Sequence, residues 1–319
     1  MESSDGVIRP LARLGGQRPP APEWFARAIA THSDEGSATV AGAILRYSAW
    51  GEAGRRGFVF IHGGRAHRNW WRAFAPFFAD RYRVVAYDVS GMGDSDWRPR
   101  YSLDGAIDEL FAVVKAAGAD RGGRPLVVGH SFGGWLALAA VEREGEHLSG
   151  AVVIDSPIGL PDPDEGYTVI RAKKDEAARP AMRVYRTIEE PIERFRFLPN
   201  QASDALYLVD YIARTGLKEL PADFGTGWTW KFDPAQGANF DIHFDRDLFM
   251  APRCPLAFIY GEKSAFAGEG LEHLQRQSRG RSPVIMMPNV HHHLMMEEPI
   301  AFISTLRALL TTWPVRVGV

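Results

Sequence analysis

Short apolar runs alternate along the chain with segments of helical spacing, and this alternation predicts the fold class. Runs such as 58–61 and 151–154 are apolar at every position, which is typical of strands that helices cover on both faces. Residues 103–117 and 135–144 have helical spacing. The pattern predicts an α/β fold with a mainly parallel, doubly wound sheet. The runs predicted as strands are 43–49, 58–61, 82–87, 125–128, 151–154, 255–260 and 283–287.

One interval breaks this alternation. Roughly a hundred residues separate Ile154 from Pro255, far more than the dozen or so that a single crossover helix requires. We therefore predict a helical cap at 157–247, inserted into a core made of 36–156 and 248–319. Residues 1–35 are predicted to form an N-terminal arm, and its first part, rich in Gly and Pro, is expected to lie extended on the surface.

Composition and charge exclude several classes of protein. Hydrophobic residues make up 45% of the 319 residues and charged residues 24%, which excludes a disordered or coiled-coil chain. The net charge of −2 offers no attraction to polyanions, so we expect neither nucleic acid nor a membrane as a partner. The single cysteine, Cys254, cannot form an internal disulfide. Without a secretory signal or a transmembrane segment, we expect a soluble cytoplasmic protein, a monomer or a homodimer, that uses no metal or cofactor.

The strongest chemical signal is a serine between glycines. Ser131 stands between Gly129-His130 and Phe132-Gly133, directly after a predicted strand and directly before a predicted helix. A serine on so sharp a strand-to-helix turn has a strained backbone and needs small neighbours. Such a turn exposes the hydroxyl as a nucleophile, and we predict that role for Ser131. The alternative is a glycine-rich turn with a bystander serine.

A second glycine-rich loop, His62-Gly63-Gly64, follows the strand at 58–61. Acyl transfer develops negative charge on a carbonyl oxygen, and two backbone N–H groups can stabilise it. We predict that the N–H groups of Gly64 and Phe132 form this oxyanion hole, with help from the dipole of the helix that begins at Phe132. The simpler interpretation is a turn without chemistry.

Three adjacent histidines, His291, His292 and His293, follow the last predicted strand. A serine becomes a good nucleophile when an imidazole takes its proton, and loops that follow parallel strands lie at one edge of the sheet. We predict His292 as this base. Neighbouring residues of an extended chain point in alternating directions, so we do not expect the three histidines to bind one metal ion.

Together these motifs resemble the α/β-hydrolase superfamily, from about residue 40 to the C-terminus. The segment 88–95 is similar to that family's D-x-x-G-x-G-x-S turn, and the tryptophan-rich segments 67–71 and 227–234 are similar to a capped bacterial esterase-like group. The resemblance implies the α/β-hydrolase fold with a helical cap between the sixth and seventh strands, together with a Ser–His–acid triad. In the family pattern, the distance to Pro299 selects His292 as the base.

The triad acid departs from the family pattern. Most relatives carry an Asp in a Gly-x-x-Asp turn after the seventh strand, and this chain has Ser264 there. Some relatives take the acid from the end of the sixth strand, where this chain has Asp155. We therefore predict Asp155 as the acid that orients the imidazole, with Glu262 as the alternative.

Residues flanking these motifs, and aromatic residues of the cap, are predicted to line the substrate pocket. They are Gly63, Trp70, Trp71, His130, Trp228, Trp230 and His291. Several basic residues of the cap alternate with acidic ones and are interpreted as a solvated helix face rather than an anion site. They are Arg171, Lys173, Lys174, Arg183 and Arg186.

The predicted function is that of a serine hydrolase acting on a small or medium apolar carboxylic ester through an acyl-enzyme. The same triad would also serve a lactonase, a thioesterase or a hydrolase of carbon–carbon bonds. A hypothesis of another class is a non-catalytic ligand-binding module on a hydrolase scaffold, because the Gly-x-x-Asp acid is missing.

Overall fold

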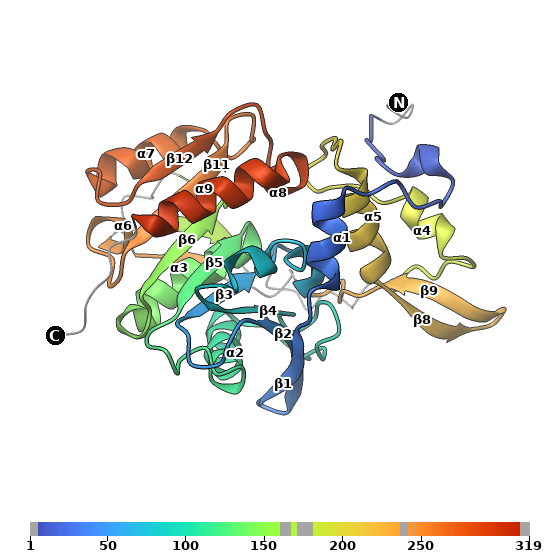
Figure 1. Cartoon of the computed structure of the whole chain (residues 1–319), viewed down its shortest axis with the longest axis horizontal. Helices are drawn as coiled ribbons and strands as arrows, with labels where there is room; N and C mark the ends of the chain where they lie inside the picture. Colours follow the sequence, from blue (N-terminus) through green and yellow to red (C-terminus); the bar gives the residue numbers. More distant parts are fainter. Residues whose placement is uncertain (1–5, 160–166, 171–180, 237–241, 246, 313–319) are drawn as a thin grey trace.

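The computed structural model of the protein describes residues 6–159, 167–170, 181–236, 242–245 and 247–312. Its centre is an eight-stranded sheet with the order β1-β2-β4-β3-β5-β6-β11-β12 (Figure 1). The pairs β1/β2 and β2/β4 are antiparallel, and the other neighbours are parallel. The strands are β1 (Asp34–Val40), β2 (Ala43–Trp50), β3 (Gly57–Ile61), β4 (Arg83–Tyr87), β5 (Leu126–His130), β6 (Gly150–Ile154), β11 (Leu256–Gly261) and β12 (Val284–Met287). The predicted mainly parallel sheet is confirmed.

The central strands are buried on both faces. In β3, Phe58 and Phe60 belong to one hydrophobic core, whereas Val59 and Ile61 belong to a second core on the opposite face. The second core is closed by α2 (Leu103–Ala116), α3 (Phe132–Glu144), α6 (Asp247–Met250) and α7 (Glu269–Ser278). The first core is closed by α1 (Glu23–Ala30), α5 (Leu206–Thr215), α8 (Leu294–Glu297) and α9 (Pro299–Thr311).

The insertion between β6 and β11 is mixed rather than helical in its described part. It holds α4 (Glu189–Glu193), α5, the short pair β7 (Tyr167–Ile170) and β10 (Ile242–Phe244), and a hairpin of β8 (Leu217–Ala222) and β9 (Gly225–Trp230). Gly225 has a φ of +105°, a conformation suited to glycine, and residues 227–230 alternate between Gly or Thr and Trp. This alternation favours a hairpin, so the predicted helical cap contains strands as well as the helices α4 and α5.

The N-terminal segment is packed in part rather than wholly extended on the surface. Leu11 is fully buried in the core that α1 helps to close, and Ile8 donates its backbone N–H to the side chain of Asn200 at 2.9 Å. Phe25, on α1, is 4% exposed. Part of the predicted surface arm is therefore packed, at Leu11 and around Ile8, whereas most of residues 12–21 are exposed.

The basic group assigned to a helix face is not helical where the structure describes it. Arg171, Lys173 and Lys174 lie outside the described residues. Arg183 and Arg186 are exposed and flank Tyr185, which pairs as a β-bridge with Trp228 of β9. The two arginines stack on the rings of Tyr185 and Phe224, and the bridge to β9 explains why this segment forms no helix.

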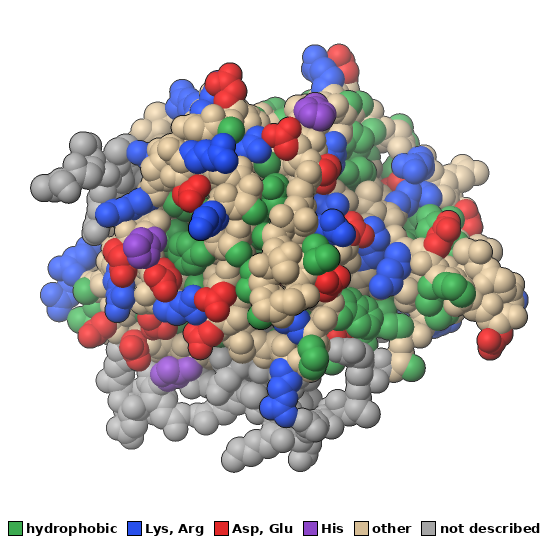
Figure 2. Space-filling view, turned by 90° about the horizontal axis from the view of Figure 1, so that it is seen from below, with side chains coloured by type: hydrophobic (Ala, Val, Ile, Leu, Met, Phe, Trp, Pro, Cys, Tyr) green, Lys and Arg blue, Asp and Glu red, His purple; other side chains and the backbone are tan. Residues whose placement is uncertain are grey.

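The surface carries both signs of charge. Figure 2 shows acidic and basic side chains interspersed over one face of the molecule, in keeping with the net charge of −2. Among the described residues, every helix is too short or too polar to span a lipid bilayer.

Candidate active site

Ser131 occupies a strained turn between β5 and α3. Its φ is +54° and its ψ −117°, a backbone conformation that L-residues rarely adopt. The backbone N–H of Ser131 donates to the carbonyl oxygen of Ile154 at 2.9 Å, and this bond joins the turn to the end of β6. A side chain at Gly133 would collide with the carbonyl oxygens of Ile61 and His62. The glycine therefore allows α3 to begin directly against β3, and the serine lies at the carboxyl edge of the sheet.

Asp155 and His292 form a buried pair beside this edge. The two atoms Asp155 Oδ1 and His292 Nδ1 are 2.9 Å apart, and the exposed fractions of the two side chains are 0% and 3%. Burial lowers the pKa of His292 to about 3. Burial also raises the pKa of Asp155 to about 6, although hydrogen bonds from Ser264 and from the N–H of Gly261 lower it in part. Above pH 6 the pair therefore consists of a carboxylate and a neutral imidazole whose Nδ1–H donates to it.

Ser264 and Glu262 play different parts in the turn after β11. The hydroxyl of Ser264 donates to Asp155 Oδ1, and the N–H of Gly261 donates to Asp155 Oδ2 at 2.7 Å. Glu262 is exposed and accepts the backbone N–H of Asn289 at 2.8 Å, so its carboxylate holds the loop before the histidines. The contact of Ser264 with the acid was not expected from the sequence, although the place of Ser264 in the family's Gly-x-x-Asp turn was the available signal.

Two further histidines pack against His292. The ring of His130 lies 4.7 Å from that of His292, and the ring of His293 lies 4.6 Å from it. His130 Nε2 donates to the carbonyl of His292 at 3.1 Å, and His293 Nδ1 donates to Oε1 of Gln201 at 2.8 Å. Burial lowers the pKa of both imidazoles. Gln201 belongs to the insertion, so the insertion holds the histidine loop directly.

The His62-Gly63-Gly64 loop lies against the serine turn. His62 donates from Nδ1 to the carbonyl of Gly63 at 2.8 Å and accepts the N–H of Val89 at Nε2. Its ring therefore holds the loop to the segment that follows β4. A methyl group added to Gly63 would lie 3.5 Å from Cβ of Ser131, and one on Gly64 would lie 3.8 Å from Cβ of Phe132. Gly64 is exposed, so a bound molecule could reach its backbone.

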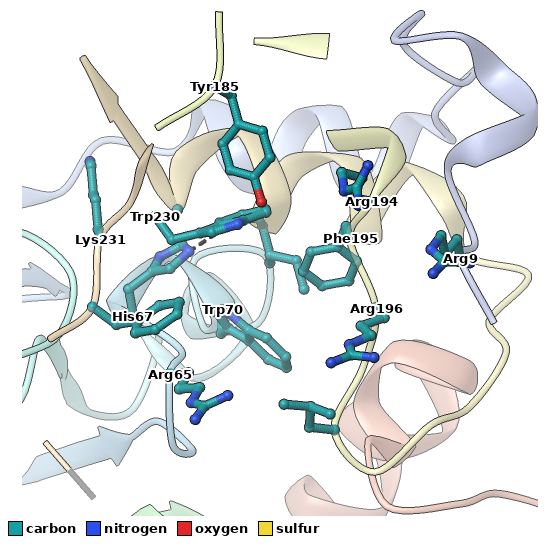
Figure 3. Close-up of a pocket in the computed structure, with 14 residues that line it drawn as sticks. Arg9, Arg65, His67, Trp70, Tyr185, Arg194, Phe195, Arg196, Trp230 and Lys231 are labelled. Carbon is teal, nitrogen blue, oxygen red and sulfur yellow. Dashed lines mark hydrogen bonds between the residues drawn. The ribbon is translucent and has the colours of Figure 1, made fainter. Parts of the chain in front are cut away.

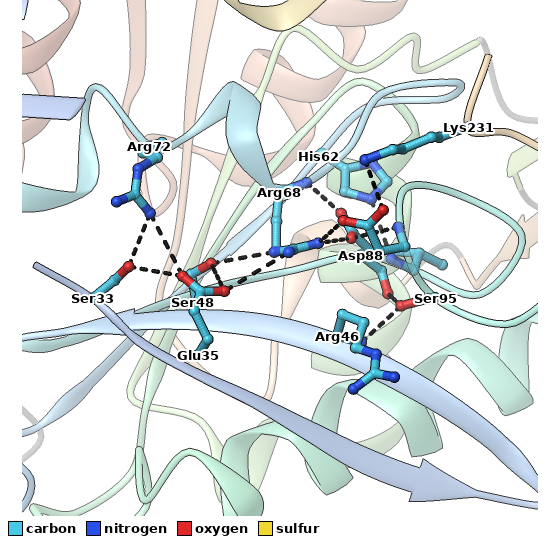
Figure 4. A network of polar contacts seen from close by, with 12 residues as sticks. Ser33, Glu35, Arg46, Ser48, His62, Arg68, Arg72, Asp88, Ser95 and Lys231 are labelled. Carbon is cyan, nitrogen blue, oxygen red and sulfur yellow. Dashed lines mark hydrogen bonds and ion pairs between the residues drawn. The ribbon is translucent and has the colours of Figure 1, made fainter. Parts of the chain in front are cut away.

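A polar network anchors the chain that follows this loop (Figure 4). The buried carboxylate of Asp88 accepts the backbone N–H of Arg68 at 2.6 Å and also pairs with the Arg68 guanidinium. Asp94 bonds Arg68 at 2.9 Å and Lys231, from the insertion, at 2.7 Å. The D-x-x-G-x-G-x-S turn thus ties the loop after β3 to the end of β9.

A cavity of about 390 Å³ lies between this loop and the insertion (Figure 3). Trp70 and Trp230, both predicted to line a pocket, line it. Gly63, His130 and Trp228 do not line this cavity. Trp71 was also predicted there, but it is 1% exposed and stacks on Phe60 at 4.4 Å, because it faces the core instead.

His291 also lies outside this cavity. Its side chain is 46% exposed and pairs with Glu297 at 3.2 Å. Among the described residues, three side chains with metal-ligand chemistry come together only at Glu144, Glu146 and His147, on the surface. Exposed groups of this kind are common without an ion, so the cluster carries no site.

Comparison with known proteins adds four findings. Residues 58–305 match the sequence profile described as "Alpha/beta hydrolase family". A pimeloyl-[acyl-carrier protein] methyl ester esterase of Chromobacterium violaceum is 25% identical over 80% of this chain and 94% of its own length. The proline iminopeptidase PfmaB of Pestalotiopsis fici is 28% identical, but the match spans 35% of this chain and 40% of that protein. The thioesterase domain from the curacin biosynthetic pathway superposes with a TM-score of 0.68 at 18% identity, over 87% of this chain and 100% of that one, which shows the shared fold.

Proposed function

Because this chain belongs to the alpha/beta hydrolase family, we propose that it is a serine hydrolase that cleaves a carboxylic ester of small or medium size through an acyl-enzyme. The observation that carries the proposal is the 2.9 Å contact between the buried Asp155 carboxylate and His292 Nδ1, at the sheet edge where Ser131 sits on its strained turn.

In the proposed reaction, Ser131 Oγ attacks the ester carbonyl carbon while His292 Nε2 takes the hydroxyl proton. The imidazolium, stabilised by Asp155, gives that proton to the departing alkoxide, and the acyl group stays on Ser131. A water molecule, deprotonated by the same nitrogen, then attacks the acyl-enzyme and releases the carboxylic acid. The N–H groups of Gly64 and Phe132 stabilise the oxyanion in both steps.

The protonation states of the pair support this assignment. A base must be neutral at the start of the reaction, and burial keeps the pKa of His292 low, at about 3. The carboxylate of Asp155 stabilises the positive charge that forms on His292 only after proton transfer, so it favours the transition state over the ground state.

Ester cleavage is preferred over lactone, thioester and carbon–carbon bond cleavage because a relative matched over 80% of this chain and 94% of its own length is named as a methyl ester esterase. Ser131 and the 2.9 Å acid–imidazole contact likewise favour a working enzyme over a non-catalytic binding module.

The test is labelling and turnover in matched serine variants. A fluorophosphonate probe is expected to label the wild-type protein at Ser131, and Ser131→Ala is expected to lose both the label and turnover of p-nitrophenyl acetate. Ser282→Ala, which removes another buried hydroxyl far along the sequence, serves as the control and keeps both. Unchanged turnover in Ser131→Ala, or a wild-type protein that does not react with the probe, would overturn the proposal.

A further inference from the structure

The charges around the cavity between the Gly64 loop and the insertion are strongly asymmetric. Its lining includes five cationic side chains and no Asp or Glu. They come from the N-terminal segment, the loop after Gly64, the segment after α4 and the end of β9, and are Arg9, Arg65, Arg194, Arg196 and Lys231. The whole chain has a net charge of −2, so this concentration of positive charge is local. From this cavity we infer that the substrate carries an anionic oxygen group, a carboxylate or a phosphate, which binds here; the inference rests on the proposed function.

Three of these cations have no carboxylate partner. Within the described part of the chain, the side chains of Arg194 and Arg196 form no hydrogen bond or ion pair, and the side chain of Arg65 only stacks on Phe232, with its guanidinium carbon 5.5 Å from the ring centroid. Lys231, by contrast, is neutralised by Asp94 at 2.7 Å. Guanidinium groups without partners are available for a ligand, and their planar donors suit the paired oxygens of carboxylate and phosphate.

The arginines converge on one part of the cavity. In Figure 3 the side chains of Arg65 and Arg196 come from opposite sides of Trp70 and point toward the same space. Two guanidinium groups that point into one space repel each other, and an anion between them removes that repulsion. The site is therefore suited to an anion rather than to a neutral polar group.

Aromatic walls complete the site. Trp70, Phe195 and Trp230 line the same cavity, and their faces can cover an apolar body attached to the anionic group. A volume of about 390 Å³ is enough for a small organic acid.

The cavity adjoins the reacting groups. Arg65 directly follows Gly64, and Trp70 packs on His293 with 5.5 Å between ring centroids, while His293 packs on His292. An anion held by Arg65 and Arg196 would therefore belong to a substrate whose scissile ester reaches the Gly64 loop. This geometry adds an acidic group to the apolar ester expected from the sequence.

Binding of non-hydrolysable probes to Ser131→Ala tests the inference without relying on turnover. Titration calorimetry would compare 4-phenylbutyrate and 2-phenylethyl phosphate, which are anionic, with the neutral 4-phenylbutyramide. We expect at least one anion to bind about tenfold more tightly than the amide in low salt, which is the effect of one charge-assisted hydrogen bond pair, and the preference to shrink as salt screens it. The two anions distinguish a carboxylate site from a phosphate site.

Matched arginine variants locate the binding. Arg196→Gln and Arg65→Gln in the same background are expected to lose most of the preference for the anion. Arg186→Gln changes an arginine of the insertion that stacks on Phe224 outside the cavity, and it is expected to keep the preference. Equal affinity for the anions and the amide, or an anion preference that survives both cavity variants, overturns the inference.

Kinetics separates the inference from the proposed function. In the active protein, mono(4-nitrophenyl) glutarate is expected to show a higher kcat/KM than neutral 4-nitrophenyl pentanoate, and Arg196→Gln to reduce this ratio about five- to tenfold. If both esters are cleaved through Ser131 with equal kcat/KM and the probes show no preference, the anion site is wrong while the serine hydrolase stands. If neither ester is cleaved but the anionic probe binds through Arg196, the hydrolase assignment is wrong and the anion site stands.

Discussion

Replacing Ser264 by Ala should move the acid limb of the pH–activity profile upward. The Ser264 hydroxyl donates to Asp155 Oδ1, the same oxygen that faces His292 Nδ1, and Asp155 is fully buried. The proposed mechanism requires the carboxylate form of Asp155, so activity should fall as the pH drops through the pKa of about 6. Without the hydroxyl the carboxylate loses one of its three hydrogen-bond donors and keeps those of Gly261 and His292, so its pKa must rise.

The size of this effect follows from the hydrogen bond. A bond to a charged group contributes about 1.5–3 kcal/mol, and one pH unit corresponds to about 1.4 kcal/mol, so the acid limb should move up by about one to two pH units. If the apparent pKa rises by about 1.5, the ionised fraction at pH 7 falls from about nine-tenths to about a quarter, a loss of activity of about fourfold. At pH 9 the variant should retain wild-type turnover to within about twofold.

The assay is the pH dependence of kcat/KM for p-nitrophenyl acetate between pH 5 and pH 9. The hydroxyl of Ser264 also accepts the N–H of Phe266 at 3.1 Å, and the rings of Phe266 and His292 pack edge to face. A purely structural loss must therefore be separated from an electrostatic one. Ser264→Thr keeps a hydroxyl and should restore the wild-type acid limb. An activity loss of equal size at every pH, with the limb unmoved, would refute this reasoning.

Three other perturbations have defined outcomes. Asp155→Asn should lower kcat by a factor approaching about 10⁴, the loss in the well-studied protease that the triad resembles. Glu262→Gln should lower kcat less than about tenfold, because the Glu262 carboxylate bonds only the loop before the histidines. If steady-state assays give the reverse order, Glu262 is the acid. Gln201→Leu removes the oxygen that accepts from the ring and the backbone N–H of His293. This change should lower the free energy of unfolding by about 1–3 kcal/mol, measured by urea titration. An unchanged urea midpoint would mean that these two hydrogen bonds contribute nothing to stability. Stability should also fall as the pH drops from 6.5 to 4, because buried imidazoles with lowered pKa values take up protons only on unfolding; a urea midpoint constant over this range would contradict it. The three histidines with values between about 3 and 4 are His67, His130 and His292.

The core of the fold is predictable because its signals are local and periodic. Runs that are apolar on every residue, such as 58–61, correspond to strands whose side chains enter two cores at once. The strand Asp34–Val40 was missed because it is a polar edge strand, buried only at Ala38. The hairpin of the insertion was missed because the length of the interval indicates an insertion and does not say how it is folded.

The residues of the candidate site also differ in how far the sequence can predict them. Ser131 and Gly64 stand in short motifs whose geometry is set by the residues beside them, so the sequence indicates them directly. The cavity combines Arg9, Arg65 and Arg196 from three distant segments, and no local pattern links them. Trp71 was predicted wrongly for a different reason. The adjacent Trp70 and Trp71 point in different directions, so only Trp70 reaches the cavity and Trp71 packs in the core.

The register of the sheet explains how the acid can stand on a different strand from that of most relatives. Ile154 pairs with Ile259 in neighbouring parallel strands, so Asp155 and the turn after Gly261 emerge side by side at the same edge. The N–H of Asp155 donates to Ile259, and the N–H of Gly261 donates back to the Asp155 carboxylate. An acid from either turn can therefore face the histidine loop from nearly the same place, and the serine in the other turn can bond the acid. A serine in place of the Gly-x-x-Asp acid is thus a rearrangement within one hydrogen-bonded group, which weakens the main argument for a non-catalytic scaffold.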